Sequence, residues 1–186
     1  MGGKKDLLYF VALLPPDEIR REVTLIKESF YEKYKTKAAL KSPPHITLHM
    51  PFRWKPEKEN LLHELFSSFS SQVTPFPVEI NGFEAFPPRV IFLNVSENHE
   101  MASVQKDLVR RMRTNLNLLN ANYKDRPFRP HMTVAFRDLK KPMFNEAWEE
   151  VKDEGASFSF EAKELTLLKN INGKWETHRQ YSFNEK

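Results

Sequence analysis

The chain has 186 residues, of which 40% are hydrophobic and 29% are charged. This composition supplies enough apolar surface for one compact domain or two small lobes that share a core, and it argues against disorder. Because the sequence contains no cysteine, disulfides, thiolate metal sites and a cysteine nucleophile are excluded. No run of about 18 apolar residues is present, and the first residues lack the apolar stretch of a signal peptide. We therefore expect no membrane span and a cytoplasmic protein.

The formal net charge of +4 is a mild basic excess. Such an excess suits an anionic ligand such as RNA or a nucleotide. A surplus of positive charge that serves solubility alone would look the same, so the charge does not decide between these interpretations.

The first half of the chain predicts five elements in the order strand, helix, strand, helix, strand. The strands are expected at residues 7–14, 45–50 and 76–86, and the helices at 19–34 and 62–69. The middle strand alternates polar and apolar residues and is expected to end before Pro51.

The second half repeats this order after residue 89. Strands are expected at 89–95, 131–136, 157–168 and 175–183, helices at 101–112 and 144–151, and a polar connection at 120–125. The repeat predicts an α+β fold built as a single bilobal domain over residues 1–186, with duplicated halves at 6–86 and 89–183. A ligand cleft is expected where the two lobes meet.

Two Pro-His-x-Thr motifs, at residues 44–47 and 130–133, occupy the third element of each half. With six His and thirteen Pro in the chain, chance predicts only about 0.02 such motifs. Alternate residues of a strand share a face, so His45 and Thr47 should point the same way, as should His131 and Thr133. The alternation also places His49 on the outward face of the first strand, as part of the site wall.

These four side chains match the needs of phosphodiester cleavage by acid–base chemistry. Histidine can act as base or acid near neutral pH, so one imidazole can activate the nucleophile while the other protonates the leaving oxygen. The two threonine hydroxyls can donate hydrogen bonds to non-bridging phosphate oxygens. Nothing in this scheme requires a metal.

The motifs Pro44-His45-Ile46-Thr47-Leu48 and Pro130-His131-Met132-Thr133-Val134 resemble the signature of the 2H phosphoesterase superfamily, in its 2′-5′ RNA ligase-like branch. The likeness extends to residues 9–15 and 86–93, which are similar to that branch's opening and mid-chain strands. The resemblance implies antiparallel sheets around a central cleft with helices outside. It also implies His45 and His131 as the acid–base pair and Thr47 and Thr133 as phosphate-binding groups.

The activity that the resemblance implies is hydrolysis of 2′,3′-cyclic phosphates or 2′-5′ linkages, with RNA ends or nucleotide cyclic phosphates as partners. Two alternatives stay open: 2′-5′ ligation in the reverse direction, and a non-catalytic RNA-end or nucleotide-binding protein. The sequence does not assign which histidine is the acid. His49 and Pro51-Phe52 depart from the commonest pattern of the family, which leaves the substrate open.

Residues that flank the motifs give further candidates. We expect Arg137 to continue the outward face of the second motif strand and to bind phosphate together with the two threonines. Arg129 is a candidate substrate contact, and Phe52 and Trp54 are candidates to stack on a base. His63, His99 and His178 are interpreted as surface residues.

A metal site is not expected from the sequence. His45 and His49 have the spacing of a helical zinc site, but in a strand they would lie roughly 13 Å apart. The sequence has no His-Glu-x-x-His helix and no Asp-x-Asp cluster. We therefore predict a monomer with no metal and no cofactor.

Overall fold

The computed structural model describes residues 6–119 and 127–184. The strands of this part are β1 (Leu7–Leu13), β2 (Ile46–Trp54), β3 (Phe76–Phe86), β4 (Val90–Val95), β5 (His131–Ala135), β6 (Ser157–Ala162), β7 (Glu164–Ile171) and β8 (Lys174–Ser182). The helices are α1 (Asp17–Tyr34), α2 (Glu59–Ser70), α3 (His99–Leu116) and α4 (Lys141–Val151), with short 3₁₀ turns η1 (Ala38–Lys41) and η2 (Pro56–Lys58). The α+β class is confirmed. The polar connection expected at 120–125 lies outside the described residues.

Two antiparallel four-stranded sheets organise the fold. The first sheet has the order β2-β1-β7-β8 and the second has the order β5-β4-β3-β6. The expectation of a single strand over residues 157–168 is wrong, because the chain leaves the second sheet after β6 and enters the first sheet as β7. Only Lys163 separates the two strands, so one extended segment contributes to both sheets.

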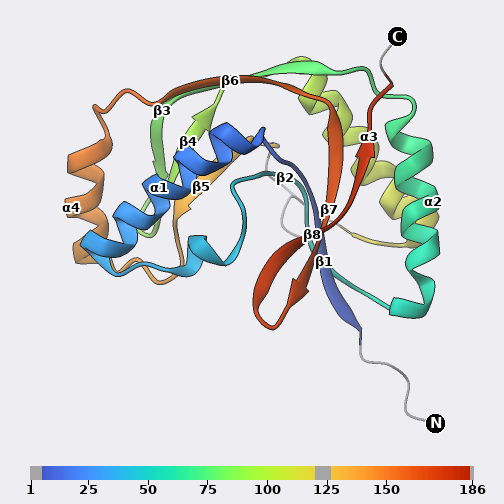
Figure 1. Ribbon diagram of the computed structural model, residues 1–186, viewed down its shortest axis with the longest axis horizontal. Helices are drawn as coiled ribbons and strands as arrows, with labels where there is room; N and C mark the ends of the chain where they lie inside the picture. Colours follow the sequence, from blue (N-terminus) through green and yellow to red (C-terminus); the bar gives the residue numbers. More distant parts are fainter. Residues whose placement is uncertain (1–5, 120–126, 185–186) are drawn as a thin grey trace.

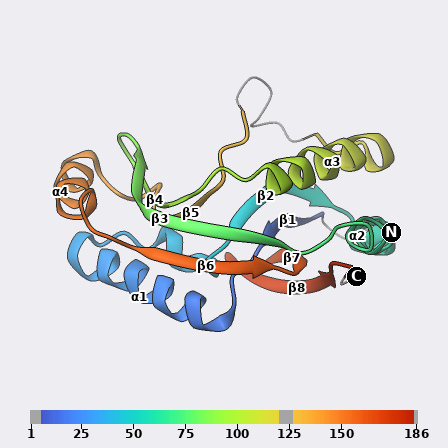
Figure 2. The same cartoon turned by 90° about the horizontal axis from the view of Figure 1, so that it is seen from above.

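The chain halves interleave instead of forming one lobe each. Strand β3 of the first half belongs to the second sheet, while β7 and β8 of the second half complete the first. The helices also exchange between sheets. Helix α1 packs with α4 against the second sheet, near β5 and β4, whereas α3 packs with α2 against the first sheet, near β2. Figure 1 shows α1 and α4 on one side of the molecule and α2 and α3 on the other, and Figure 2 shows the same separation.

The two motif strands are the edge strands that meet at the junction of the sheets. β2 ends one sheet, β5 ends the other, and the two strands contact each other. The expectation that the first motif strand stops before Pro51 is wrong, since β2 continues to Trp54. An edge strand tolerates a proline because one side of it needs no ladder hydrogen bond.

Two apolar clusters stabilise this arrangement. The main cluster runs from the helices through both sheets and includes Tyr9, Phe66, Ile80 and Leu93. A small second cluster lies on the opposite face of β1 and comprises Phe10, Ala12, Leu14, Leu168 and the half-buried Trp175. Among the described residues, no helix is long and apolar enough to cross a membrane.

Asp138 links the loop after β5 to the segment before β2. Its carboxylate accepts hydrogen bonds from the Thr36 hydroxyl (2.6 Å) and from the backbone N–H groups of Lys37 (3.0 Å) and Ala38 (3.3 Å). These bonds fix η1, which leads directly into the first Pro-His-x-Thr motif. The two motif strands are therefore connected through a carboxylate as well as through packing.

We expect Asp138→Ala to lower the free energy of unfolding by about 1 to 2 kcal/mol, because it removes hydrogen bonds to a charged group. Urea titration followed by circular dichroism measures this change. The matched control is Asp153→Ala, at an exposed position after α4, which should stay within about 0.5 kcal/mol of the parent. Equal stabilities for the two variants would contradict the linking role of Asp138.

Candidate active site

Each motif histidine is held by the same backbone contact. The Nδ1 atom of His45 lies 2.7 Å from the carbonyl oxygen of Pro43, and Nδ1 of His131 lies 2.8 Å from that of Arg129. A carbonyl oxygen can only accept, so Nδ1 carries the proton in both rings. Neutral imidazole then presents Nε2 as a lone-pair acceptor, which is the form that a general base requires.

Aromatic rings hold the two imidazoles from behind. Phe10 of β1 lies 4.8 Å from the His45 ring, centroid to centroid, and Trp175 of β8 meets Phe10 edge to face at 4.7 Å. On the other sheet, Phe92 and Phe86 lie 5.1 and 5.3 Å from the His131 ring. These contacts restrict the rotation of both imidazoles.

Thr47 and Thr133 lie two residues beyond their histidines, with His45 directly before β2 and His131 as the first residue of β5. Thr47 pairs with Ala12, which belongs to the small apolar cluster beside His45, and Thr133 pairs with Phe92, which contacts His131. All four motif side chains are half-buried. Within residues 6–119 and 127–184, neither threonine hydroxyl has a hydrogen-bond partner. Both hydroxyls can therefore donate to a bound group.

The pKa values of both imidazoles are shifted downward. Burial, the charge of Lys27 and the neighbouring His131 together lower the pKa of His45 to about 4, against a hydrogen bond to Pro43 that raises it. Burial, followed by the Arg129 charge, lowers the pKa of His131. The effect of His131 on the pKa of His45 agrees with the direct contact between β2 and β5.

Lys27 is a buried cation behind His45. Its side chain projects from α1 with 2% of its surface exposed, and its Nζ donates to the carbonyl oxygens of Ala39 (3.2 Å) and Ser42 (3.1 Å). Burial lowers the pKa of Lys27 to about 7. The residue holds the segment that precedes Pro43, and it discourages protonation of His45.

The flanking residues proposed from the sequence have different positions. Arg129 pairs with Glu84, and its guanidinium lies over the rings of Phe86 (5.1 Å) and Phe92 (5.5 Å), beside His131. Arg137 does not continue the strand face as expected, because β5 ends at Ala135 and the backbone at Arg137 turns to a φ of 62°. Its exposed guanidinium packs over Phe136.

The two aromatic candidates are not beside the histidines. Phe52 is 7% exposed and stacks on Tyr9 within the main apolar cluster, so the expectation that it stacks on a base is wrong. Trp54 lies at the far end of β2, roughly 25 to 30 Å along the strand from His45, where its indole N–H donates to the Lys58 carbonyl. The aromatic residues that do flank the site are Phe10, Phe86, Phe92 and Trp175.

His49 points into the core, which corrects the expectation that it shares a face with Thr47. A register shift in the β1–β2 ladder pairs His49 with Val11 but Thr47 with Ala12, so the two side chains take opposite faces. The His49 side chain is fully buried, and its Nδ1 lies 2.9 Å from the Met50 carbonyl oxygen. A shared metal site for His45 and His49 is therefore not available.

Sequence reasoning missed Lys27 and Trp175. The signal for Lys27 was present, since it falls at helical spacing between Val23 and Phe30 on the apolar face of α1. The β7–β8 hairpin, whose turn uses Asn172 and Gly173 with positive φ values of 51° and 84°, brings Trp175 against Phe10, the ring that contacts His45. No local sequence pattern predicts that contact.

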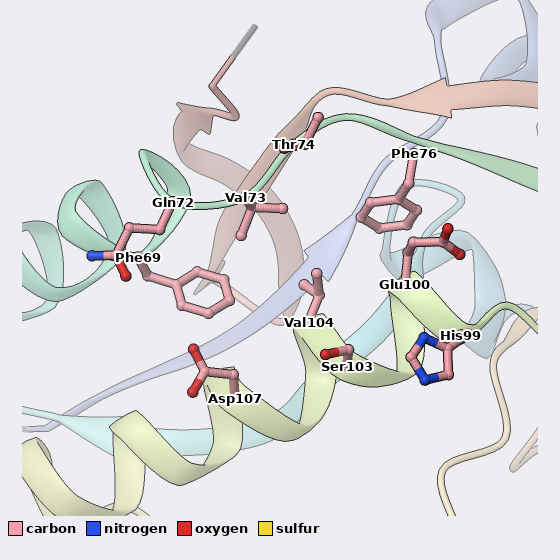
Figure 3. Close-up of a pocket in the computed structure, with 10 residues that line it drawn as sticks. All are labelled: Phe69, Gln72, Val73, Thr74, Phe76, His99, Glu100, Ser103, Val104 and Asp107. Atoms are coloured by element: carbon pink, nitrogen blue, oxygen red, sulfur yellow. The ribbon is translucent and has the colours of Figure 1, made fainter. Parts of the chain in front are cut away.

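A surface pocket of about 320 Å³ lies away from the histidine pair, between the end of α2 and the first turns of α3 (Figure 3). Its lining combines apolar residues such as Phe69 and Phe76 with the acidic side chains of Glu100 and Asp107. Asp107 is engaged by Arg110 and Arg111. Carboxylates at its wall make this pocket a poor host for a phosphate group.

Two imidazoles at the start of the edge strands β2 and β5, each followed two residues later by a threonine, are the arrangement of a phosphoesterase of the two-histidine class. A family model described as the 2′-5′ RNA ligase superfamily matches residues 15–174. The chain therefore belongs to the 2′-5′ RNA ligase superfamily.

Similar proteins agree with this assignment. A protein of Geobacillus kaustophilus named "Putative phosphoesterase" is 25% identical over 177 residues, covering 93% of this chain and 94% of the relative. The solved structure of TT0787 from Thermus thermophilus has a TM-score of 0.73 at 19% identity and covers 97% of this chain and all of its own. LigT of E. coli has a TM-score of 0.69 at 20% identity, covering 98% and 100% of the two chains. At these identities the solved structures establish the shared fold.

We expect Lys27→Met to raise the pKa of His45, because the substitution removes a nearby positive charge that disfavours imidazolium. Titration of the His45 Cε1 proton by NMR measures the change. Lys106→Met, at an exposed position of α3, is the control and should leave His45 unchanged. An unchanged or lower His45 pKa in Lys27→Met would show that the Lys27 ammonium does not act on the ring.

Proposed function

We propose that the chain hydrolyses 2′,3′-cyclic phosphates or 2′-5′ linkages of RNA or nucleotides by two-histidine acid–base catalysis. The observation that carries this proposal is the matched pair of Nδ1 hydrogen bonds to Pro43 and Arg129. They leave two Nε2 atoms, on adjacent edge strands, free to exchange protons with one substrate. Family membership and the phosphoesterase names of the relatives support the same class of reaction.

Two proton transfers accompany the proposed cleavage. One neutral imidazole removes a proton from water as the water oxygen attacks phosphorus. The other imidazole, in its protonated form, donates a proton from Nε2 to the ribose oxygen that leaves. The hydroxyls of Thr47 and Thr133 donate to non-bridging oxygens, whose negative charge grows in the transition state. Proton exchange with solvent then restores the starting state of both rings, and by microscopic reversibility the two histidine roles exchange in the ligation direction.

The surroundings of the histidines favour a nucleotide as substrate. Phe86 is a half-buried ring beside His131, and Trp175 is a half-buried ring that contacts Phe10, the neighbour of His45. A base can stack on such rings. Arg129 and Arg137 supply positive charge near the second motif, for phosphates beyond the one that is cleaved. LigT of E. coli, which shares the fold, has been solved with 3′-AMP, with phosphate and with ATP.

We expect His45→Ala and His131→Ala each to reduce hydrolysis of a 2′,3′-cyclic nucleotide by about 10² to 10⁴-fold, with the fold unchanged. The double variant should be little worse than either single variant, because the two rings serve one step. Turnover of the parent should persist in excess EDTA. Initial rates and circular dichroism spectra provide the measurements.

His99→Ala is the matched control, since His99 is exposed at the first residue of α3 and lines the separate surface pocket. It should keep the parent rate. A single motif variant that retains more than about a tenth of the parent rate would refute the two-histidine mechanism. Complete loss in EDTA, with recovery on adding zinc or manganese, would refute metal-independent catalysis.

The pH dependence follows from the direction of the two pKa shifts. Activity needs one protonated and one neutral imidazole, and both pKa values lie below the usual 6.5 in the free enzyme. We therefore expect kcat/KM to follow a bell whose maximum lies below pH 6.5. The kcat profile should lie at higher pH, because a bound phosphate anion favours imidazolium. A kcat/KM maximum above pH 7 would contradict this electrostatic assignment.

A further inference from the structure

A second group of polar side chains lies on the opposite face of the first sheet and comprises Glu59, His63 and His178, here called the Glu59 cluster. Glu59 is the first residue of α2, His63 follows one turn later, and His178 lies on β8. Nε2 of His178 is 3.1 Å from Oε2 of Glu59, and Nε2 of His63 is 4.0 Å from the same oxygen. The side chains of His63 and His178, interpreted from the sequence as surface residues, are 22% and 26% exposed, and both lie beside the Glu59 carboxylate.

The hydrogen bonds around the cluster orient its ligand atoms. Lys169 (2.8 Å) and the Tyr9 hydroxyl both donate to Oε1 of Glu59, and Nε2 of His178 donates to Oε2 at 3.1 Å. A metal ion bound here would replace the proton on that Nε2. Nδ1 of His63 lies 2.5 Å from the Tyr181 hydroxyl, so its Nε2 is the free ring nitrogen. In metal sites of proteins, the ring nitrogen or carboxylate oxygen that does not bind the metal is usually fixed by a hydrogen bond of this kind.

A bulge in β8 brings His178 into the cluster. The ladder pairs Leu168 with Thr177 and Leu167 with Arg179, so His178 is the extra residue between two paired ones. Its ring consequently reaches the helix side of the sheet, where it stacks on His63 at 5.9 Å and meets Tyr9 edge to face at 6.0 Å. Bulges commonly re-aim a side chain in this way beside functional sites.

We propose that the Glu59 cluster binds a zinc-like divalent transition metal ion through Oε2 of Glu59 and Nε2 of His63 and His178. One ligand atom from each of the three residues lies within 4.8 Å of the other two. Small rotations of the side chains would bring them to the separation of about 3.3 Å that bonds of about 2.0 to 2.1 Å require. Two imidazoles and one carboxylate leave a fourth tetrahedral position for a water molecule.

The charges and donor types define which ion fits. Two nitrogen donors select zinc, copper, nickel or cobalt over magnesium and calcium, which prefer oxygen. Glu59 supplies one negative charge, while Lys169 bonds to it and Arg179 acts electrostatically on His63. These two cations repel a bound metal ion, so the affinity for the metal should be lower than at a site with anionic surroundings.

This site is separate from the proposed active site. Tyr9 contacts the Glu59 cluster, and its neighbour Phe10 contacts His45 on the other face of β1. A metal here would connect α2 to β8, the outer strand of the first sheet. Its effect should therefore appear in stability and not in turnover.

The test is titration of the chelator-treated protein with zinc chloride by calorimetry, carried out in the His45→Ala, His131→Ala double variant so that the motif imidazoles cannot contribute. We expect one zinc ion per chain and a higher melting temperature, with no comparable effect of magnesium. Adding His63→Ala or His178→Ala should weaken zinc binding at least tenfold, while adding His99→Ala should leave it unchanged. The proposal would be overturned if the double variant bound no zinc, or if it bound zinc equally well with and without the cluster substitutions.

X-ray absorption at the zinc edge tests the same site without any substitution in the cluster. Two imidazoles in the coordination shell of the zinc-loaded double variant would support the site, and fewer than two would overturn it. The zinc measurements do not depend on phosphodiester hydrolysis, because they use a variant that lacks both motif histidines. In the parent, EDTA should remove the thermal stability that zinc adds while leaving turnover unchanged. The two proposals are thereby tested independently.

Discussion

The hydrogen bond from each motif Nδ1 to the carbonyl two residues earlier fixes the tautomer and the direction of the ring. The proline between the two partners explains why this contact forms twice. Proline fixes its own φ and keeps the preceding residue out of the helical region, so the backbone arrives extended at the histidine. Each motif therefore carries its own means of orienting an imidazole, and the rest of the fold has only to bring two edge strands together.

Three side chains from other elements hold β2 and the segment before it, and the first of them also connects this segment to the loop after β5. Asp138 connects the loop after β5 to the segment before β2, Lys27 holds that segment from α1, and Gln105 of α3 donates to the Leu48 carbonyl of β2 at 3.3 Å. Lys27 has a second effect, because its charge acts on His45, and Arg129 acts similarly on His131. The groups that position the imidazoles thus also keep them neutral in the free enzyme.

The sequence predicted most of the elements and the pairing of the motifs, because periodicity and an improbable repeated motif are local signals. It did not predict the register shift that turns His49 into the core, nor the single-residue switch at Lys163 from one sheet to the other. Both depend on which strand lies alongside, and that is a tertiary property. The same limit explains Phe52, whose neighbour Tyr9 is 43 residues away in sequence, and His178, which meets Glu59 across 119 residues. Lys27 is different, since a lysine on an apolar helical stripe could have been noticed.

The crossing of the helices has a consequence for the origin of the fold. The helix between β1 and β2 packs near the strands of the second sheet, and the helix between β4 and β5 packs near the first. A chain with only one such half would leave its sheet uncovered and its helix without a surface to cover. Two identical copies could satisfy both needs by exchanging helices about a twofold axis, with one histidine from each copy at that axis. Neither half of this chain is therefore expected to fold as an independent unit, because each sheet needs a helix that the other half supplies.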